Sequence, residues 1–104
     1  MNSIKKIAIT GFLGLVVLST AVPADVVRGQ KIFIKKLKPA CGFDGGQFAM
    51  KHTQKEWDEI HTAGKFSEEI TKICPKGQLD PKFLPDVYDF TYHYGRGSGN
   101  VPSC

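Results

Sequence analysis

The sequence predicts an all-α fold, on three observations. Apolar residues recur at helical intervals near the carboxyl end, where Phe83, Val87, Phe90 and Tyr94 fall at i, i+4, i+7 and i+11. Capping and turn residues divide the rest of the chain into short segments. No stretch of useful length alternates apolar and polar residues as a strand does. We therefore expect a bundle of about four short helices.

The first expected helix covers residues 25–37, where apolar residues repeat at near-helical intervals. Gly29 lies inside it, at a cost of about 1 kcal/mol relative to Ala. A glycine kept at that cost often marks a close crossing by another helix. Pro39 is expected to end the helix, and residues 41–46 are expected to form a loop.

The second expected helix begins with a capping box. In the run from Thr53 to Glu56, the Thr53 hydroxyl can accept the Glu56 N–H, while the Glu56 carboxylate accepts the Thr53 N–H. The helix should cover residues 54–63 and end at Gly64.

Two more helices are expected before the tail. Ser67 should open a short third helix, with two glutamates at the favourable end of its dipole, and this helix should end before Pro75. Asp80 should cap the fourth helix, with Pro81 in its first turn, and Gly95 should end it.

Residues 1–24 have the organisation of a signal peptide. Two lysines precede an apolar run over residues 7–22, and Val22-Pro23-Ala24 offers small residues at the positions that a signal peptidase reads. A membrane anchor is the alternative, but the run is shorter than the ~20 residues that a spanning helix needs. We expect cleavage after Ala24 and a periplasmic or secreted mature protein with no stable membrane span.

The mature chain, residues 25–104, is expected to form a single domain. Cleavage lowers the net charge from +4 to +2, because two of the 14 basic residues leave and no acidic one does. So small a charge makes nucleic acid an improbable partner. A basic cluster on the first helix favours either an acidic partner surface or simple solvation of that helix face. Its members are Lys31, Lys35, Lys36 and Lys38.

Three cysteines in an oxidising compartment predict a disulfide, because so short a chain buries only a marginal core. The tail, residues 96–104, is too rich in Gly, Ser, Asn and Pro for a helix, and it ends in Cys104. We expect a disulfide to pin the tail, joining Cys104 to Cys74 or, alternatively, to Cys41. Closing a loop of about thirty residues would contribute roughly 3–4 kcal/mol.

The first helix and the loop after it resemble small class I c-type cytochromes. In that family a Gly-x-x-x-Phe pair is followed by C-x-x-C-H, whose thiols bond haem and whose His ligates the iron. Gly29 and Phe33 fit the pair. Leu37 and Ala40 stand where the thiols should be, and Cys41 stands where the His should be. Haem attachment by two thioether bonds is therefore excluded.

Three later passages extend the resemblance over residues 27–94. HTQKEWDEI is similar to a helix start of bacterial cytochromes c, GKFSEEITKI to the short helix after it, and LDPKFLPDVYDFTYHY to the closing helix. The resemblance implies a cytochrome c-like bundle whose first and last helices cross at Gly29. It also implies an exported electron-transfer setting with a redox protein or cytochrome as partner.

If haem is bound, the candidate ligands include Cys41, His52 and Met50, with Cys41 able to supply one thioether or a thiolate. His52 lies eleven residues beyond Cys41, too far for the C-H adjacency of the family, and its position before the Thr53 cap favours a structural role. Copper is the alternative metal at His52, since the Met50-x-His52 pair mixes thioether and imidazole. Zinc is not favoured, because the sequence contains neither C-x-x-C nor H-x-x-x-H spacing.

No catalytic residues are predicted, and the chain is not expected to be an enzyme. No base accompanies Cys41, and the neighbouring carboxylates Glu68 and Glu69 point in different directions on a helix. Two functions remain. The first, which the resemblance favours, is a cytochrome c-like protein of an electron-transfer chain with non-canonical haem binding. The second is a haem-free, disulfide-stapled helical interaction module or accessory subunit of a redox complex.

Overall fold

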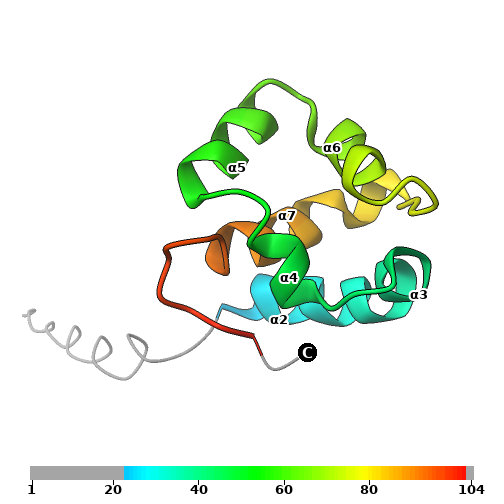
Figure 1. Ribbon diagram of the computed structural model, residues 1–104, viewed down its shortest axis with the longest axis horizontal. Helices are drawn as coiled ribbons and strands as arrows, with labels where there is room; N and C mark the ends of the chain where they lie inside the picture. The colour runs from blue at the N-terminus through cyan, green and yellow to red at the C-terminus, as the bar shows by residue number, and fades with distance from the viewer. Residues whose placement is uncertain (1–22, 103–104) are drawn as a thin grey trace, which may run out of the picture.

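The computed structural model describes residues 23–102, and all regular structure within that part of the chain is helical, which confirms the all-α prediction (Figure 1). The elements are α2 (Ala24–Ile32), the π-helical turn η2 (Phe33–Leu37), α3 (Lys38–Cys41), α4 (Gly45–Ala49), α5 (Gln54–Thr62), α6 (Phe66–Ile73), the 3₁₀ turn η3 (Pro81–Phe83) and α7 (Leu84–His93).

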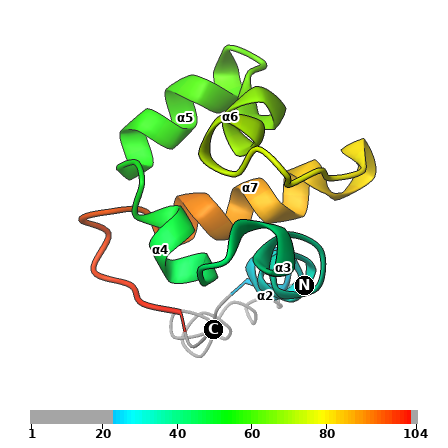
Figure 2. The same cartoon turned by 45° about the vertical axis from the view of Figure 1, so that its right-hand side comes forward.

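Helix α7 forms the centre of the bundle. It packs against α2 and α4 on one side and against α5 and α6 on the other, as both views show (Figures 1 and 2). The core between these helices is largely aromatic. Its fully buried members include Phe33, Phe48, Trp57 and Phe90.

The first and last helices cross at Gly29, as the sequence predicts. A Cβ atom placed on Gly29 would lie 2.7 Å from the carbonyl carbon of Asp86 and 2.9 Å from Cβ of Phe90. Both distances are shorter than van der Waals contact, so the approach of α7 depends on the missing side chain. Arg28 spans the same crossing, with Nε 2.9 Å from Oδ2 of Asp86.

Pro39 does not end the first helix, contrary to the prediction. The chain widens into a π-helical turn over residues 33–37, in which the Lys38 N–H donates to the Phe33 carbonyl. Pro39 then falls in the first turn of α3, where a missing N–H costs nothing. The helical path therefore continues to Cys41 and ends at Gly42, whose φ of 82° suits glycine.

Helix α4 begins inside the predicted loop of residues 41–46 and continues to Ala49, where the sequence predicts no helix. The helix is short and begins with two glycines, so its helix propensity is low. It is nevertheless capped by Asp44, whose Oδ1 accepts the Gln47 N–H at 2.8 Å. The predicted capping box of α5 is present, with Thr53 and Glu56 each accepting the other's backbone N–H. Helix α6 begins one residue before the predicted Ser67.

Residues 1–22 of the predicted signal peptide and Cys104 of the tail lie outside the described residues. Within residues 23–102, none of the helices is long and apolar enough to cross a membrane.

Candidate functional site

The structure pairs Cys41 with Cys74 in a disulfide, with a Cα–Cα distance of 5.1 Å. The predicted bonds from Cys104 to Cys74 or to Cys41 are therefore wrong. The physical reason is the π-helical turn and α3, which carry Cys41 beyond the expected helix end. Its sulfur then meets the end of α6, where Cys74 is the C-cap.

The chain that follows the disulfide covers its Cys74 end, whereas Cys41 is half-buried. Cys74 is 2% exposed, and a Cβ atom on Gly77 would lie 2.9 Å from the Cys74 Sγ and 3.2 Å from Cδ2 of Leu37. Only glycine allows the backbone to close over the sulfur in this way. Such burial is typical of a structural disulfide rather than of a reactive one.

The described part of the tail, residues 96–102, folds back through hydrogen bonds. The Arg96 N–H donates to the His52 carbonyl at 2.9 Å, and the Arg96 guanidinium donates to the Met50 carbonyl at 3.2 Å. Asn100 Nδ2 donates to the His93 carbonyl at 3.0 Å. Farther along, Pro102 reaches Gly46 in α4. These contacts hold this part of the tail in place.

His52 lies between two carboxylates. Its Nε2 is 2.7 Å from Oε2 of Glu69, and its Nδ1 is 3.4 Å from Oε1 of Glu56. The edge of its ring meets Trp57 at a centroid distance of 4.7 Å. The imidazole therefore ties the start of α5 to α6, which is the structural role that the position before the cap favours.

Glu56 joins this arrangement to the tail. Its carboxylate accepts the Thr53 N–H, and that hydrogen bond is the main reason why the pKa of Glu56 is lowered; His52 and the charge of Arg96 lower it further. Arg96 Nη2 lies 3.5 Å from Oε1 of Glu56. The Glu56 carboxylate therefore contacts the N-cap of α5, the imidazole of His52 and the guanidinium of Arg96.

The three residues predicted as haem ligands are not assembled around a common space. Cys41 is held in the disulfide at the end of α3, so its sulfur is neither a free thiol nor a thiolate, which contradicts its predicted role. His52 has carboxylates at both ring nitrogens. Met50 follows α4, and it is 54% exposed.

Aromatic rings fill the interior beneath His52. Phe33 and Phe48 lie 5.2 Å apart between ring centroids, Phe48 stacks on Trp57 at 5.8 Å, and Phe33 meets Phe90 at 5.9 Å. The Trp57 indole N–H donates to the Ala49 carbonyl at 2.8 Å. The polar atom of the buried tryptophan is therefore satisfied within the protein.

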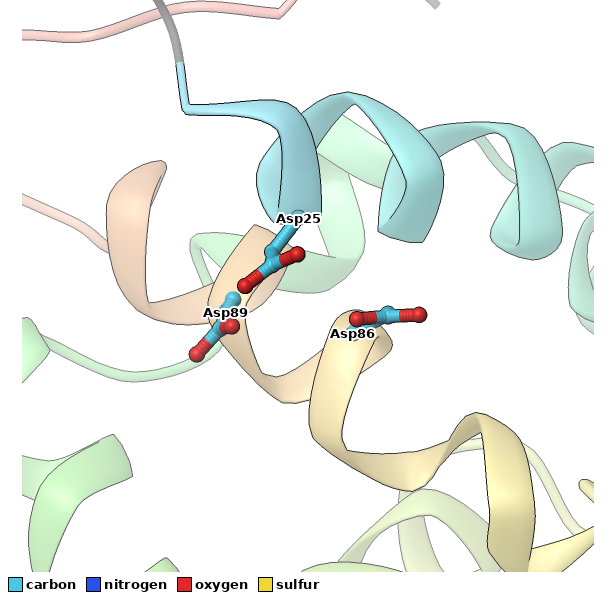
Figure 3. Close-up of side chains that lie close together, drawn as sticks. All are labelled: Asp25, Asp86 and Asp89. Carbon is cyan, nitrogen blue, oxygen red and sulfur yellow. The ribbon is translucent and has the colours of Figure 1, made fainter.

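Three carboxylates gather where α2 meets α7: Asp25, Asp86 and Asp89 each offer an oxygen within 4.8 Å of the others (Figure 3). Arg28 already pairs with two of them, at 2.6 Å from Asp25 and 2.9 Å from Asp86. Burial raises the pKa of Asp89, and the charges of Asp25 and Asp86 raise it further. The group does not include His52, so it does not support the predicted metal ligand.

The raised pKa of Asp89 predicts a stabilising substitution. Above that pKa the ionised carboxylate is disfavoured in the folded state, so Asp89→Asn should raise the free energy of unfolding at pH 7, by less than about 1 kcal/mol. The gain should shrink as the pH falls through the folded pKa and vanish below about pH 4, the ordinary pKa of an aspartate. Urea denaturation across this pH range measures it, and a gain that persists in acid would contradict the assigned cause.

The other two histidines, His61 and His93, each lie against an aromatic ring. His61 is exposed, and it stacks on Tyr88 with a centroid distance of 3.9 Å. Burial raises the pKa of Tyr88 to about 12. His93 is half-buried against Tyr94, and neither histidine belongs to a group of three or more metal-ligating side chains in the part of the chain described.

Comparisons with protein-family models, with curated proteins and with solved structures find no match for this chain. The structure itself defines the class: a small all-α domain with an aromatic core, stapled by one disulfide.

Proposed function

We propose that this chain is a haem-free, disulfide-stapled helical module that acts by binding another protein, as an accessory subunit in an exported redox complex. The observation that carries the proposal is the filled interior. A haem needs an apolar cavity, and here that space is taken by fully buried aromatic rings in mutual contact. Four rings make up this group: Phe33, Phe48, Trp57 and Phe90.

The ligand positions support the same conclusion. The oxidised sulfur of Cys41 cannot form a thioether, and His52 would have to give up its contact with either Glu56 or Glu69 before it could bind a metal. The crossing of α2 and α7 at Gly29 agrees with a cytochrome c-like architecture. We propose that this architecture supports a protein-binding surface and does not hold a haem.

The disulfide also supports an extracytoplasmic location, because such bonds persist in oxidising compartments. We propose export to the periplasm or beyond, in keeping with the predicted signal peptide.

Titration of the folded protein with haem tests the proposal. Trp57 is the only tryptophan, so its fluorescence reports on the core. We expect no saturable Soret band and no quenching of Trp57 beyond that caused by light absorption by free haem, because haem cannot enter without displacing the buried rings.

Two histidine variants make this titration specific. His52→Ala and His61→Ala should behave like the unaltered protein, His61 being an exposed control. A stoichiometric Soret band that is lost in His52→Ala and kept in His61→Ala would contradict the proposal and establish His52 as an iron ligand.

A further inference from the structure

A groove with positively charged walls lies between α2–η2 and the η3 turn. One part has a volume of about 310 Å³ and is lined by Arg28, Lys31, Ile32, Lys35, Lys36 and Phe83. The adjoining part, of about 530 Å³, is lined by Lys36, Gln78, Leu79, Asp80, Lys82 and Phe83. Because Lys36 and Phe83 line both parts, they form one continuous surface, which we call the basic groove.

The lysines of the basic groove have no carboxylate partner in the part of the chain described, although Lys82 Nζ lies over the Phe83 ring at 5.1 Å from its centroid. Among the described residues, no carboxylate oxygen lies within 4.0 Å of the ammonium groups of its four lysines. These are Lys31, Lys35, Lys36 and Lys82, all of them exposed.

The lysines of α5 and α6 behave differently. Lys55 lies 3.9 Å from Glu59, and Lys72 lies 3.6 Å from Glu69. Lys65, which caps α6, lies 3.8 Å from Glu68. Seven of the ten lysines among the described residues have no carboxylate within 4.0 Å. Four of the seven line the groove, and the others are Lys38, Lys51 and Lys76. This concentration of uncompensated positive charge favours an anionic partner at the groove.

The floor of the basic groove is apolar and its wall is fixed. Ile32, Leu79 and Phe83 are half-buried between the lysines. Arg28 is held in place by its ion pairs with Asp25 and Asp86, which orders one end of the groove. A ligand for this surface must offer both negative charge and apolar side chains.

From this combination we infer that the basic groove binds an acidic segment of a partner protein in which carboxylates flank apolar side chains. The inference rests on the proposed function and names the chemistry of the partner. Carboxylates would pair with the four ammonium groups, and apolar side chains would reach Ile32 and Phe83. An anionic bilayer fits less well, because these two residues lie half-buried between the lysines instead of projecting beyond them.

A short synthetic peptide in which glutamates flank leucine and phenylalanine tests the inference, with binding followed by fluorescence anisotropy of the labelled peptide. The groove variant is Lys31→Gln/Lys35→Gln/Lys36→Gln. The matched control is Lys55→Gln/Lys65→Gln/Lys72→Gln, which lowers the net charge by the same amount at lysines that have carboxylate partners. Circular dichroism establishes that both variants are folded.

We expect the groove variant to weaken the affinity for the peptide by about tenfold or more, and the control to change it little. Amide NMR shifts caused by the peptide should fall at Ile32, Lys36 and Phe83. Equal weakening by both variants would show that only net charge matters and would overturn the inference.

Anionic vesicles of phosphatidylglycerol and phosphatidylcholine provide the competing test. Binding to these vesicles, with no binding to the peptide, would assign the groove to a membrane and would also overturn the inference. The haem titration is independent of these results, so failure of the groove is distinguishable from failure of the haem-free proposal.

Discussion

The double substitution Cys41→Ala/Cys74→Ala should lower the free energy of unfolding by about 3–4 kcal/mol. The bond joins cysteines separated by 33 positions, and on the chain-entropy model its removal frees a loop of that length in the unfolded state. A core this small has little stability to spare. Urea denaturation of the oxidised protein and of the variant measures the difference.

Two comparisons make the disulfide experiment specific. Reduction of the unaltered protein should bring its denaturation midpoint close to that of the double variant. Cys104→Ala should leave the midpoint unchanged, because Cys41 and Cys74 already bond to each other. A loss of stability in Cys104→Ala, with none in the double variant, would contradict the pairing.

Gly29→Ala should lower the free energy of unfolding by about 1–3 kcal/mol as a result of overpacking. The sign of the effect is informative, because alanine in a free helix is about 1 kcal/mol more favourable than glycine. Here the added Cβ would overlap the backbone of Asp86 and the side chain of Phe90, which forces α2 and α7 apart. Gly29→Leu should be more damaging still.

The matched control for Gly29 is Lys31→Ala, an exposed position on the same helix that should change stability by less than about 0.5 kcal/mol. Thermal or urea denaturation compares the variants. A stabilised Gly29→Ala protein would show that α7 does not approach α2 at this residue.

The features that the sequence predicts correctly depend on nearby residues or on one strong signal. The capping box of α5 requires only Thr53 and Glu56, three positions apart. The cost of a glycine inside a helix predicts a close crossing at Gly29. The resemblance to class I c-type cytochromes implies that the last helix makes this crossing. The capping box and the close crossing at Gly29 each follow from the residues of one short segment.

The features that the sequence does not predict depend on tertiary position. The partner of Cys41 is fixed by the π-helical turn, which lets the helix continue past Pro39, and no local pattern announces that turn. The sequence favours a bond to Cys104 because ordering a tail rich in glycine is costly and this tail ends in a cysteine. Gly77 allows the chain to pass close to the disulfide, but no local sequence pattern marks it as a close-approach position.

The surroundings of His52 show the same limit at the candidate site. The sequence places His52 before a helix cap, but its closest partner, Glu69, comes 17 positions later. Arg96 reaches the same group from beyond α7. Judged by residue type alone, His52 is a candidate metal ligand. In the folded protein, however, both of its ring nitrogens contact carboxylates.

The central claim is that Cys41 serves the fold and not a haem. Non-reducing peptide mapping of the exported protein, purified from its native compartment, tests this most directly. The account predicts one peptide pair joining Cys41 to Cys74, with no haem mass on either peptide. A Cys41 peptide that carries haem, or a Cys41 or Cys74 peptide joined to Cys104, would contradict it.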